Sequence, residues 1–428
     1  TTPTPSGAPS ALPLVHYHRW RILTTLGLGT DAQAALTAAR ECDDRWCFPV
    51  RLDDVAVLEA VLCEHADPRA AALLGHWMYH HGRSRDAIAH WESAVDDDPG
   101  NAVAWRNLGL ARHRTGGPTD AVTTAYDRAV MADPGQPRLW FERDQLAERT
   151  GTPLSVRIRD LEARPTLVRS RDDSTTALAN LYLSVGRTDE AIALLDSHDF
   201  QPWEGGEGPV LRVWERAQLA RSRALTSADP GAALLAVESA IDPPPRLGEQ
   251  RHPLASAALL HLVQGDLLDR LHRPHEARLA WQRATARLAD FVDMQVQPIS
   301  AVSFACVLAH HRLGDGAAAD ELINRIEQHC SDLEADSGAA DFFATSRPVT
   351  MVFPPDPVVE SHRLAALVRA QLDACRGDRA RAVGHVTALL RDDPGHSGAH
   401  DLHQWLQHPG FFPVPTASAG LPKKGTRA

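Results

Sequence analysis

Apolar residues in this chain recur at helical spacing, and small residues mark the same places in successive blocks. Residues 68–101 carry Gly75, Ala87, Trp91 and a closing Pro99. The next block repeats this order, and its corresponding members are Trp105, Leu108, Gly109, Tyr126, Ala129 and Pro134. Self-similarity at such a period indicates stacked supersecondary units. The pattern therefore predicts a series of helix–turn–helix hairpins.

The small residues have a physical role in this pattern. Gly75 and Ala87 lack bulky side chains, so the two helices of one hairpin can approach closely where they cross. We expect Trp91 to fill the space toward the next hairpin. We expect Pro99 to end the second helix, because proline cannot continue the helical hydrogen-bond ladder.

Weaker copies of the pattern extend over the rest of the chain. They lie at Tyr182, Gly186, Ala191 and Leu195; at Gly265, Leu268, Ala277, Trp281 and Ala284; at Gly314, Ala319 and Ile323; and at Gly377, Ala382, Leu389 and Pro394. Leu14 to Arg40 fits a further hairpin with Gly29 in its turn, and Ser397 to Gln407 fits a capping helix. The whole chain is expected to hold about seven hairpins.

The order of these residues resembles the tetratricopeptide repeat, whose unit has about 34 residues. Pro99 and Pro134 lie 35 residues apart, and Gly117 or Pro118 in the inter-helix turn can absorb the extra residue. The predicted fold class is all-α, a right-handed α-solenoid of tetratricopeptide-like helical hairpins.

The repeats divide the chain into eight segments. Residues 1–13 are predicted to be flexible, 14–66 to form a hairpin plus an extra helix, 67–198 to form repeats, and 199–209 to form a loop rich in Trp, Gly and Glu. Residues 210–330 are predicted to form further repeats, 331–358 an irregular loop, 359–407 the last repeat with its capping helix, and 408–428 a flexible tail. The chain starts at Thr1 and not at Met, so we expect a fragment or a processed chain.

Three irregular stretches carry a more specific resemblance. They read WCFPVRLDDVAVLE at 46–59, FQPWEGGEG at 200–208 and DFFATSRP at 341–348. In this order they are similar to a family of large bacterial tetratricopeptide proteins whose N-terminal half is a β-rich domain of unknown function. The resemblance covers residues 14–405 and implies that the chain corresponds to the C-terminal, helical half. It also implies a partner, the β-rich half, which resembles carbohydrate-handling modules.

A candidate binding groove follows from the repeat geometry, in which the first helix of each hairpin lines the inner face of the solenoid. If Pro68 and Ala102 open their repeats, the inward positions are Arg69, His76, Tyr79, His80, Arg106, His113 and Arg114. Clustered arginines suit carboxylates, such as an acidic peptide end or an acidic sugar. The alternative is that these arginines form ion pairs within the chain.

The loop with Trp203, Glu204 and Glu207 is the second candidate. A tryptophan beside paired acids is the combination used in sugar binding and in glycosidic acid catalysis. Glu204 and Glu207 are therefore the catalytic candidates, although two acids on a loop do not fix the separation that catalysis needs. The alternatives are packing of the loop on the following helix, or contact with the β-rich half.

The third candidate is the aperiodic run from Phe342 to Met351. Its binding candidates are Phe342, Phe343 and Arg347. A long loop of this composition is expected to dock, either on the solenoid or on a partner.

Composition narrows the function classes. A net charge of −11 argues against a nucleic-acid partner, and no apolar run approaches the roughly 18 residues of a membrane span. The histidine pairs lack the spacing of zinc ligands, so we predict no metal. The only lysines, Lys423 and Lys424, lie in the tail, so no phosphate-binding Gly-Lys loop exists and we predict no cofactor.

The remaining counts bear on the source and the compartment. Two of the 44 basic residues are lysines, and such an arginine bias is typical of high-GC bacterial coding. The six scattered cysteines make no disulfide framework, so we expect reduced thiols and a cytoplasmic location.

The predicted function is a scaffold without its own enzymatic activity, which binds another protein or protein domain. The first alternative is the helical half of a carbohydrate-active enzyme, with the Trp203–Glu207 loop closing over a sugar. The second alternative is a peptide receptor that uses the Arg69–Arg114 groove.

Overall fold

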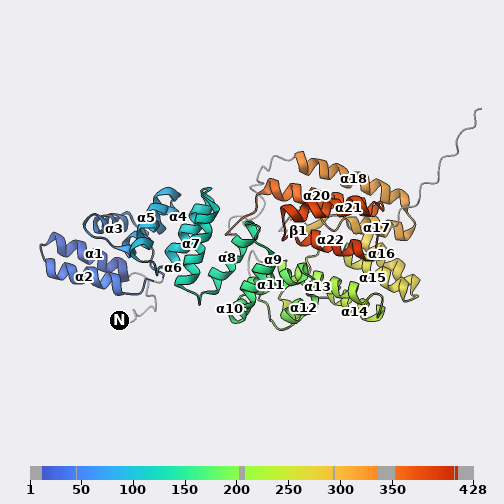
Figure 1. The fold of residues 1–428 in the computed structure, drawn as a ribbon, viewed down its shortest axis with the longest axis horizontal. Helices are drawn as coiled ribbons and strands as arrows, with labels where there is room; N and C mark the ends of the chain where they lie inside the picture. The colour runs from blue at the N-terminus through green and yellow to red at the C-terminus, as the bar shows by residue number, and fades with distance from the viewer. Residues whose placement is uncertain are drawn as a thin grey trace, which may run out of the picture. The chain divides into compact units, whose positions relative to one another are not determined.

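A computed structural model describes residues 12–44, 46–201, 208–292, 295–335, 352–408 and 410–412. The chain folds into two compact units, Thr1–Leu146 and Ala147–Ala428. In both units the regular structure is almost entirely helical, and successive helices pair into hairpins (Figure 1). The predicted fold class, an all-α solenoid of tetratricopeptide-like hairpins, is confirmed.

The first unit contains seven consecutive helices and most of an eighth. They are α1 (Leu12–Thr25), α2 (Gly29–Glu41), α3 (Leu52–Glu64), α4 (Pro68–His80), α5 (Ser84–Asp97), α6 (Ala102–Arg114), α7 (Thr119–Ala132) and α8 (Pro137–Arg149), which contains the boundary between the units. Local chemistry sets where they begin. The Asp67 side chain accepts a hydrogen bond from the Ala70 amide at 3.0 Å, and Pro68 takes the first helical position of α4.

The hairpin turns depend on a residue with left-handed backbone angles. Gly82 has a φ of 75°, which lets the Arg83 amide reach back to the Met78 carbonyl at 2.9 Å. The same bond recurs in the turn at Gly186, and in a third turn His272 adopts this backbone without being a glycine.

The turn of the first hairpin differs from the prediction. Gly29 was expected in this turn, but it is the first residue of α2. Gly27 takes the left-handed conformation instead, with a φ of 73°. The turn therefore has the same form as the others and lies two residues earlier than expected.

A glycine on the first helix of a hairpin receives the aromatic ring of the second helix. A Cβ atom at Gly75 would lie 2.6 Å from Nε1 of Trp91, and one at Gly109 would lie 2.8 Å from Cδ2 of Tyr126. Trp91 also donates to the Ala72 carbonyl at 3.2 Å. The expectation that Trp91 fills the space toward the next hairpin is thus corrected, because its ring packs on α4 within its own hairpin.

The second unit continues the pattern with helices of more varied length, from five residues in α10 to twenty in α18. Its elements are α9 (Leu154–Glu162), α10 (Pro165–Arg169), α11 (Asp172–Ser184), α12 (Thr188–Asp196), α13 (Pro209–Leu225), α14 (Pro230–Ile241), a short 3-10 turn (Pro245–Leu247), α15 (Ala258–Arg270), α16 (Pro274–Thr285), β1 (Asp290–Val292), β2 (Gln295–Gln297), α17 (Phe304–Leu313), α18 (Gly316–Ala335), α20 (Pro357–Cys375), α21 (Arg379–Asp392) and α22 (Ser397–Gln407).

A small antiparallel ribbon, β1–β2, interrupts the helices of this unit, with Phe291 opposite Val296. Asp290 holds it in place, because its carboxylate accepts hydrogen bonds from the Ser256 amide at 2.7 Å and the Ser300 hydroxyl at 3.0 Å. This ribbon was not predicted, since a three-residue strand leaves no periodic signal.

Three segments differ from the expected boundaries. Helix α18 runs to Ala335, although a loop was expected from residue 331, and α1 already begins at Leu12. The expected flexible tail starts with packed residues, because Phe411 is buried and its ring stacks on Trp405 at 4.1 Å. Apolar contact with the solenoid thus orders residues that composition alone assigned to a mobile end.

Candidate functional site

Arg69, the first residue of the predicted groove, holds the end of the preceding hairpin. Its guanidinium donates to the carbonyls of Ala39 (2.9 Å) and Cys42, and its Nε lies 3.4 Å from the Asp44 carboxylate. These carbonyls lie at the C-terminal end of α2, where unpaired carbonyls need donors. Arg69 therefore joins α4 to α2.

Arg106 forms a buried bidentate ion pair in the first unit. Its guanidinium binds both carboxylate oxygens of Glu142, at 2.7 and 2.8 Å, and Glu142 also accepts from Arg138 and from the Tyr126 hydroxyl. Burial works to raise the pKa of Glu142, but the two arginines outweigh it and the pKa is lowered. An ionised Glu142 thus ties α6, α7 and α8 together.

His76 is held as a neutral imidazole. Its Nδ1 accepts from Trp91 Nε1 at 3.2 Å and faces the Asn107 amide nitrogen at 3.3 Å. Burial lowers its pKa to about 4. The adjacent Tyr79 ring lies against Trp91, and its buried hydroxyl has no hydrogen-bond partner among the described residues.

The other predicted groove residues lie near helix ends. His80 is exposed and contacts the His81 ring edge-on, while His113 is half-buried and Arg114 is exposed in the last turn of α6. The structure thus brings His76, Asn107, Arg106 and Glu142 into one hydrogen-bonded chain. The guanidinium groups of Arg69 and Arg106 both have carboxylate partners within the chain, as the ion-pair alternative requires.

Six candidates lie outside the described residues. They are Trp203, Glu204, Glu207, Phe342, Phe343 and Arg347. Two described residues at the start of the predicted 199–209 loop are hydrogen-bonded to other segments: the Phe200 amide donates to the Arg246 carbonyl at 2.8 Å, and the Gln201 amide donates to Asp172 at 2.8 Å.

Four large apolar side chains are exposed in the segment that leads into α3 and at its first residue. Trp46, Phe48, Val50 and Leu52 are 74, 58, 77 and 75 % exposed, whereas Cys47 between them is buried. We call these four residues the Trp46–Leu52 patch. Phe48 and Val50 alternate in the sequence with the buried Cys47 and Pro49, and this alternation was the available signal, since alternate side chains of an extended segment point to opposite sides. Trp46 has a left-handed backbone with a φ of 66°, and Leu52 is the first residue of α3, so neither belongs to that extended segment.

Hydrogen bonds hold the backbone at one end of this patch. The Asp54 carboxylate accepts from the amides of Val50 (3.1 Å) and Arg51 (3.0 Å), and it bonds His18 at 2.9 Å. Burial works to raise the pKa of Asp54, but these hydrogen bonds outweigh it and the pKa is lowered. At the edge of the patch, the Phe48 ring lies 6.1 Å from His76. The patch therefore borders the predicted groove.

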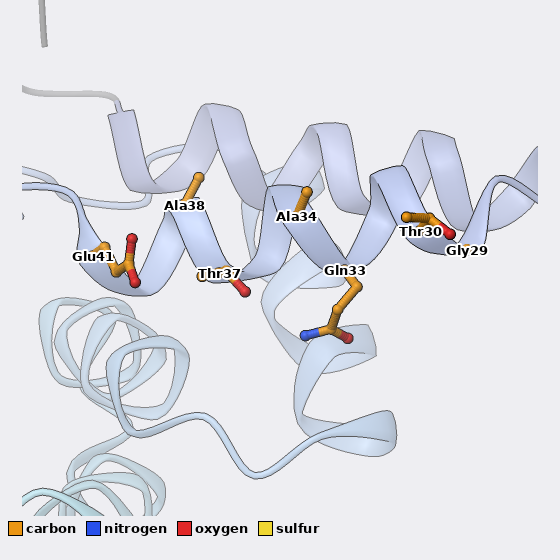
Figure 2. A pocket seen from close by; sticks show the side chains of 7 residues that line it. All are labelled: Gly29, Thr30, Gln33, Ala34, Thr37, Ala38 and Glu41. Atoms are coloured by element: carbon orange, nitrogen blue, oxygen red, sulfur yellow. The ribbon is translucent and has the colours of Figure 1, made fainter.

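A shallow depression also runs along α2 (Figure 2). Figure 2 shows that its lining comes from this one helix, and the residues are Gly29, Thr30, Gln33, Ala34, Thr37, Ala38 and Glu41. Nearly all of them are exposed. A single exposed face does not enclose a ligand, so the depression carries no site.

Metal and membrane chemistry find no support in the described residues. No three histidine, cysteine or acidic side chains meet there in a way that would hold a metal ion. Among the helices described, none combines the length and the apolar character needed to cross a membrane. All six cysteines are free thiols, and of these only Cys63 is exposed.

The hairpins with their glycine–aromatic contacts define a tetratricopeptide-type helical repeat protein. Residues 79–137 match the sequence model of the tetratricopeptide repeat. This match falls on the two blocks in which the repeat pattern is clearest, so the chain carries tetratricopeptide repeats.

Solved structures with partial likeness are repeat proteins too. YrrB, described as a TPR protein with an unusual peptide-binding site, shares 14 % identity over 43 % of this chain and 90 % of its own, with a TM-score of 0.34. A tetratricopeptide repeat protein of Parabacteroides merdae shares 12 % sequence identity. The match covers 63 % of this chain and 92 % of that protein, with a TM-score of 0.32. The C-terminal part of a TPR repeat-containing protein from Cytophaga hutchinsonii shares 14 % sequence identity. The match covers 55 % of this chain and 89 % of that structure, with a TM-score of 0.39.

Proposed function

We propose that this chain is a scaffold without its own enzymatic activity, and that it binds a protein partner through the Trp46–Leu52 patch. The exposure of these four large apolar side chains on one short segment is the observation that carries the proposal. Exposed apolar rows of this kind mark interaction sites, and tryptophan is the residue most enriched at binding hot spots. Burying an aromatic side chain of this size contributes roughly 1.5–3 kcal/mol.

The patch is suited to a preformed interface. Asp54 holds the backbone at Val50 and Arg51, so this part of the patch needs little ordering when a partner binds. The neighbouring arginines, Arg69 and Arg106, already have carboxylate partners, which favours an apolar contact over capture of an acidic peptide end.

The finer proposal concerns the kind of partner. The resemblance of residues 46–59, 200–208 and 341–348 to a family with a β-rich half makes such a domain the partner we propose, supplied by a longer precursor or by a second chain. The carbohydrate-active alternative depends on Glu204 and Glu207, which lie outside the described residues.

Affinity capture from a lysate of the source organism tests the proposal. The baits are the wild-type chain, a Trp46→Ser/Phe48→Ser variant, and a control that changes Val103 and Met131 to serine. These two control residues are also apolar and exposed in the first unit, at 58 and 70 %. We expect the same protein on the wild type and the control, and its loss from the patch variant. Equal capture by all three baits would refute a role for the patch.

A further inference from the structure

The β1–β2 ribbon of the second unit has one packed strand and one open strand. Asp290 of β1 is buried, and its carboxylate is held by Ser256 and Ser300. In β2, by contrast, Gln295 is exposed and Val296 is 55 % exposed. Strand β2 therefore forms the outer edge of this ribbon.

The pairing pattern determines which backbone groups of β2 face away from β1. Opposite residues of an antiparallel pair alternate between pairs that exchange both ladder hydrogen bonds and pairs that exchange none. The loop has two residues, so the closing pair, Val292 and Gln295, exchanges both bonds. The opposite phase would require an N–H from Pro298, which has none. Phe291 and Val296 thus form a pair without ladder bonds, and the N–H and C=O of Val296 point outward.

These outward groups are not taken up by another element. Within the part of the chain that the structure describes, no hydrogen bond reaches Gln295, Val296 or Gln297 from outside the ribbon. Unpaired N–H and C=O groups on an exposed strand are a template for pairing with another chain, and charged side chains are a common protection against it. The three residues of β2 carry no charge. The edge is therefore open to backbone pairing.

The chemistry of this edge selects an extended strand. A donor and an acceptor on the same residue match one residue of an antiparallel strand, whereas a helix uses its own backbone groups internally. Val296 shares its face with Phe291, whose ring stacks on His252 at 3.9 Å. Gln295 and Gln297 point to the other face. A matching strand therefore places a β-branched or aromatic residue opposite Val296 and polar residues on either side of it.

We propose that the outer edge of β2 is a docking site for an extended strand of a protein partner, which adds to the ribbon as its third strand. The proposal rests on the proposed function only in taking a protein as the ligand. It concerns the second unit, and its test leaves the Trp46–Leu52 patch unchanged, so either can fail without the other.

The anchoring of β1 prepares the edge for binding. Because Asp290 already holds the ribbon through Ser256 and Ser300, little ordering remains when a strand is added. The edge is short, with three residues in β2. A single added strand should therefore bind weakly, with a Kd on the order of a millimolar.

A cyclic hairpin peptide that presents the strand Thr-Val-Thr tests the proposal on the full chain with isotope-labelled valine. We expect the amide signal of Val296 to shift saturably, and its hydrogen exchange to slow by about tenfold at saturation, as one added backbone hydrogen bond predicts. The same peptide with a methyl group on the valine nitrogen has lost the donor and should not bind. Equal shifts with both peptides would refute backbone pairing.

Two variants separate the backbone group from the side chain, and anisotropy of the labelled peptide compares them. Val296→Pro removes the outward N–H but no ladder bond, as proline at an edge allows, and should weaken binding at least about tenfold. Val296→Thr keeps the N–H and should bind within about twofold of the wild type. Exchange protection of the inward Gln297 amide checks that the ribbon persists.

The proposal is wrong if Val296→Pro with an intact ribbon binds the peptide like the wild type. It is also wrong if light scattering shows a wild-type dimer that Val296→Pro dissociates, because the edge would then belong to a second copy of this chain.

Discussion

Replacing Gly75 by alanine tests whether close contact between a glycine and an aromatic ring holds these hairpins together. The new Cβ would lie 2.6 Å from Nε1 and 2.7 Å from Cδ1 of Trp91, well inside ordinary contact distance. Trp91 is 1 % exposed and donates to both Ala72 and His76, so its ring has no free space into which to move.

The magnitude follows from two opposing effects. Overpacking of a filled core costs roughly 1–3 kcal/mol. Alanine regains up to about 1 kcal/mol over glycine in helix propensity. Subtracting the propensity gain from the overpacking cost, we expect Gly75→Ala to lower the free energy of unfolding of the first unit by up to about 2 kcal/mol.

The matched control is Gly29→Ala in α2 of the same unit. A Cβ at Gly29 meets no atom within 4 Å, and the position is exposed (Figure 2). This variant should keep or slightly raise stability. Urea unfolding followed by circular dichroism and by exchange of the α4 and α5 amides provides the comparison. If Gly75→Ala is as stable as Gly29→Ala, the contact does not limit packing. A double-mutant cycle with Trp91→Leu should show the cost of Gly75→Ala falling.

Two further predictions concern buried polar groups of the first unit. Its stability should fall as the pH drops from about 6.5 toward 4, by up to about 3 kcal/mol, because only the unfolded state readily protonates His76. In His76→Asn, the free energy of unfolding, measured by urea at each pH, should depend less on pH over this range. An unchanged pH dependence would contradict a neutral imidazole at His76. Glu142→Gln should cost about 2–4 kcal/mol because Arg106 is left buried without a carboxylate. Glu92 pairs with Arg112 and is far more exposed than Glu142, so Glu92→Gln should cost less than about 1 kcal/mol in the same measurement.

The candidate site was only partly accessible to prediction. The repeat register indicated that His76 and Arg106 belong to one surface, and the structure links them through Asn107. Their chemistry was not accessible, because the carboxylate that binds Arg106 is 36 residues away in the chain. Residues 46–52 were part of the sequence run that carries the family resemblance. Whether their side chains are exposed depends on the folded chain, so the sequence did not predict the patch.

The sequence by itself determined the hairpins of this protein. Their starts and stops are local events, such as the Asp67 cap before Pro68 and the left-handed turn at Gly82, and their close crossings require small residues at fixed spacing. Only the tertiary structure decided which polar side chains meet. Stacking of successive hairpins places Asp401 on Arg216 across 185 positions, and no periodicity in the chain encodes a contact between residues that far apart.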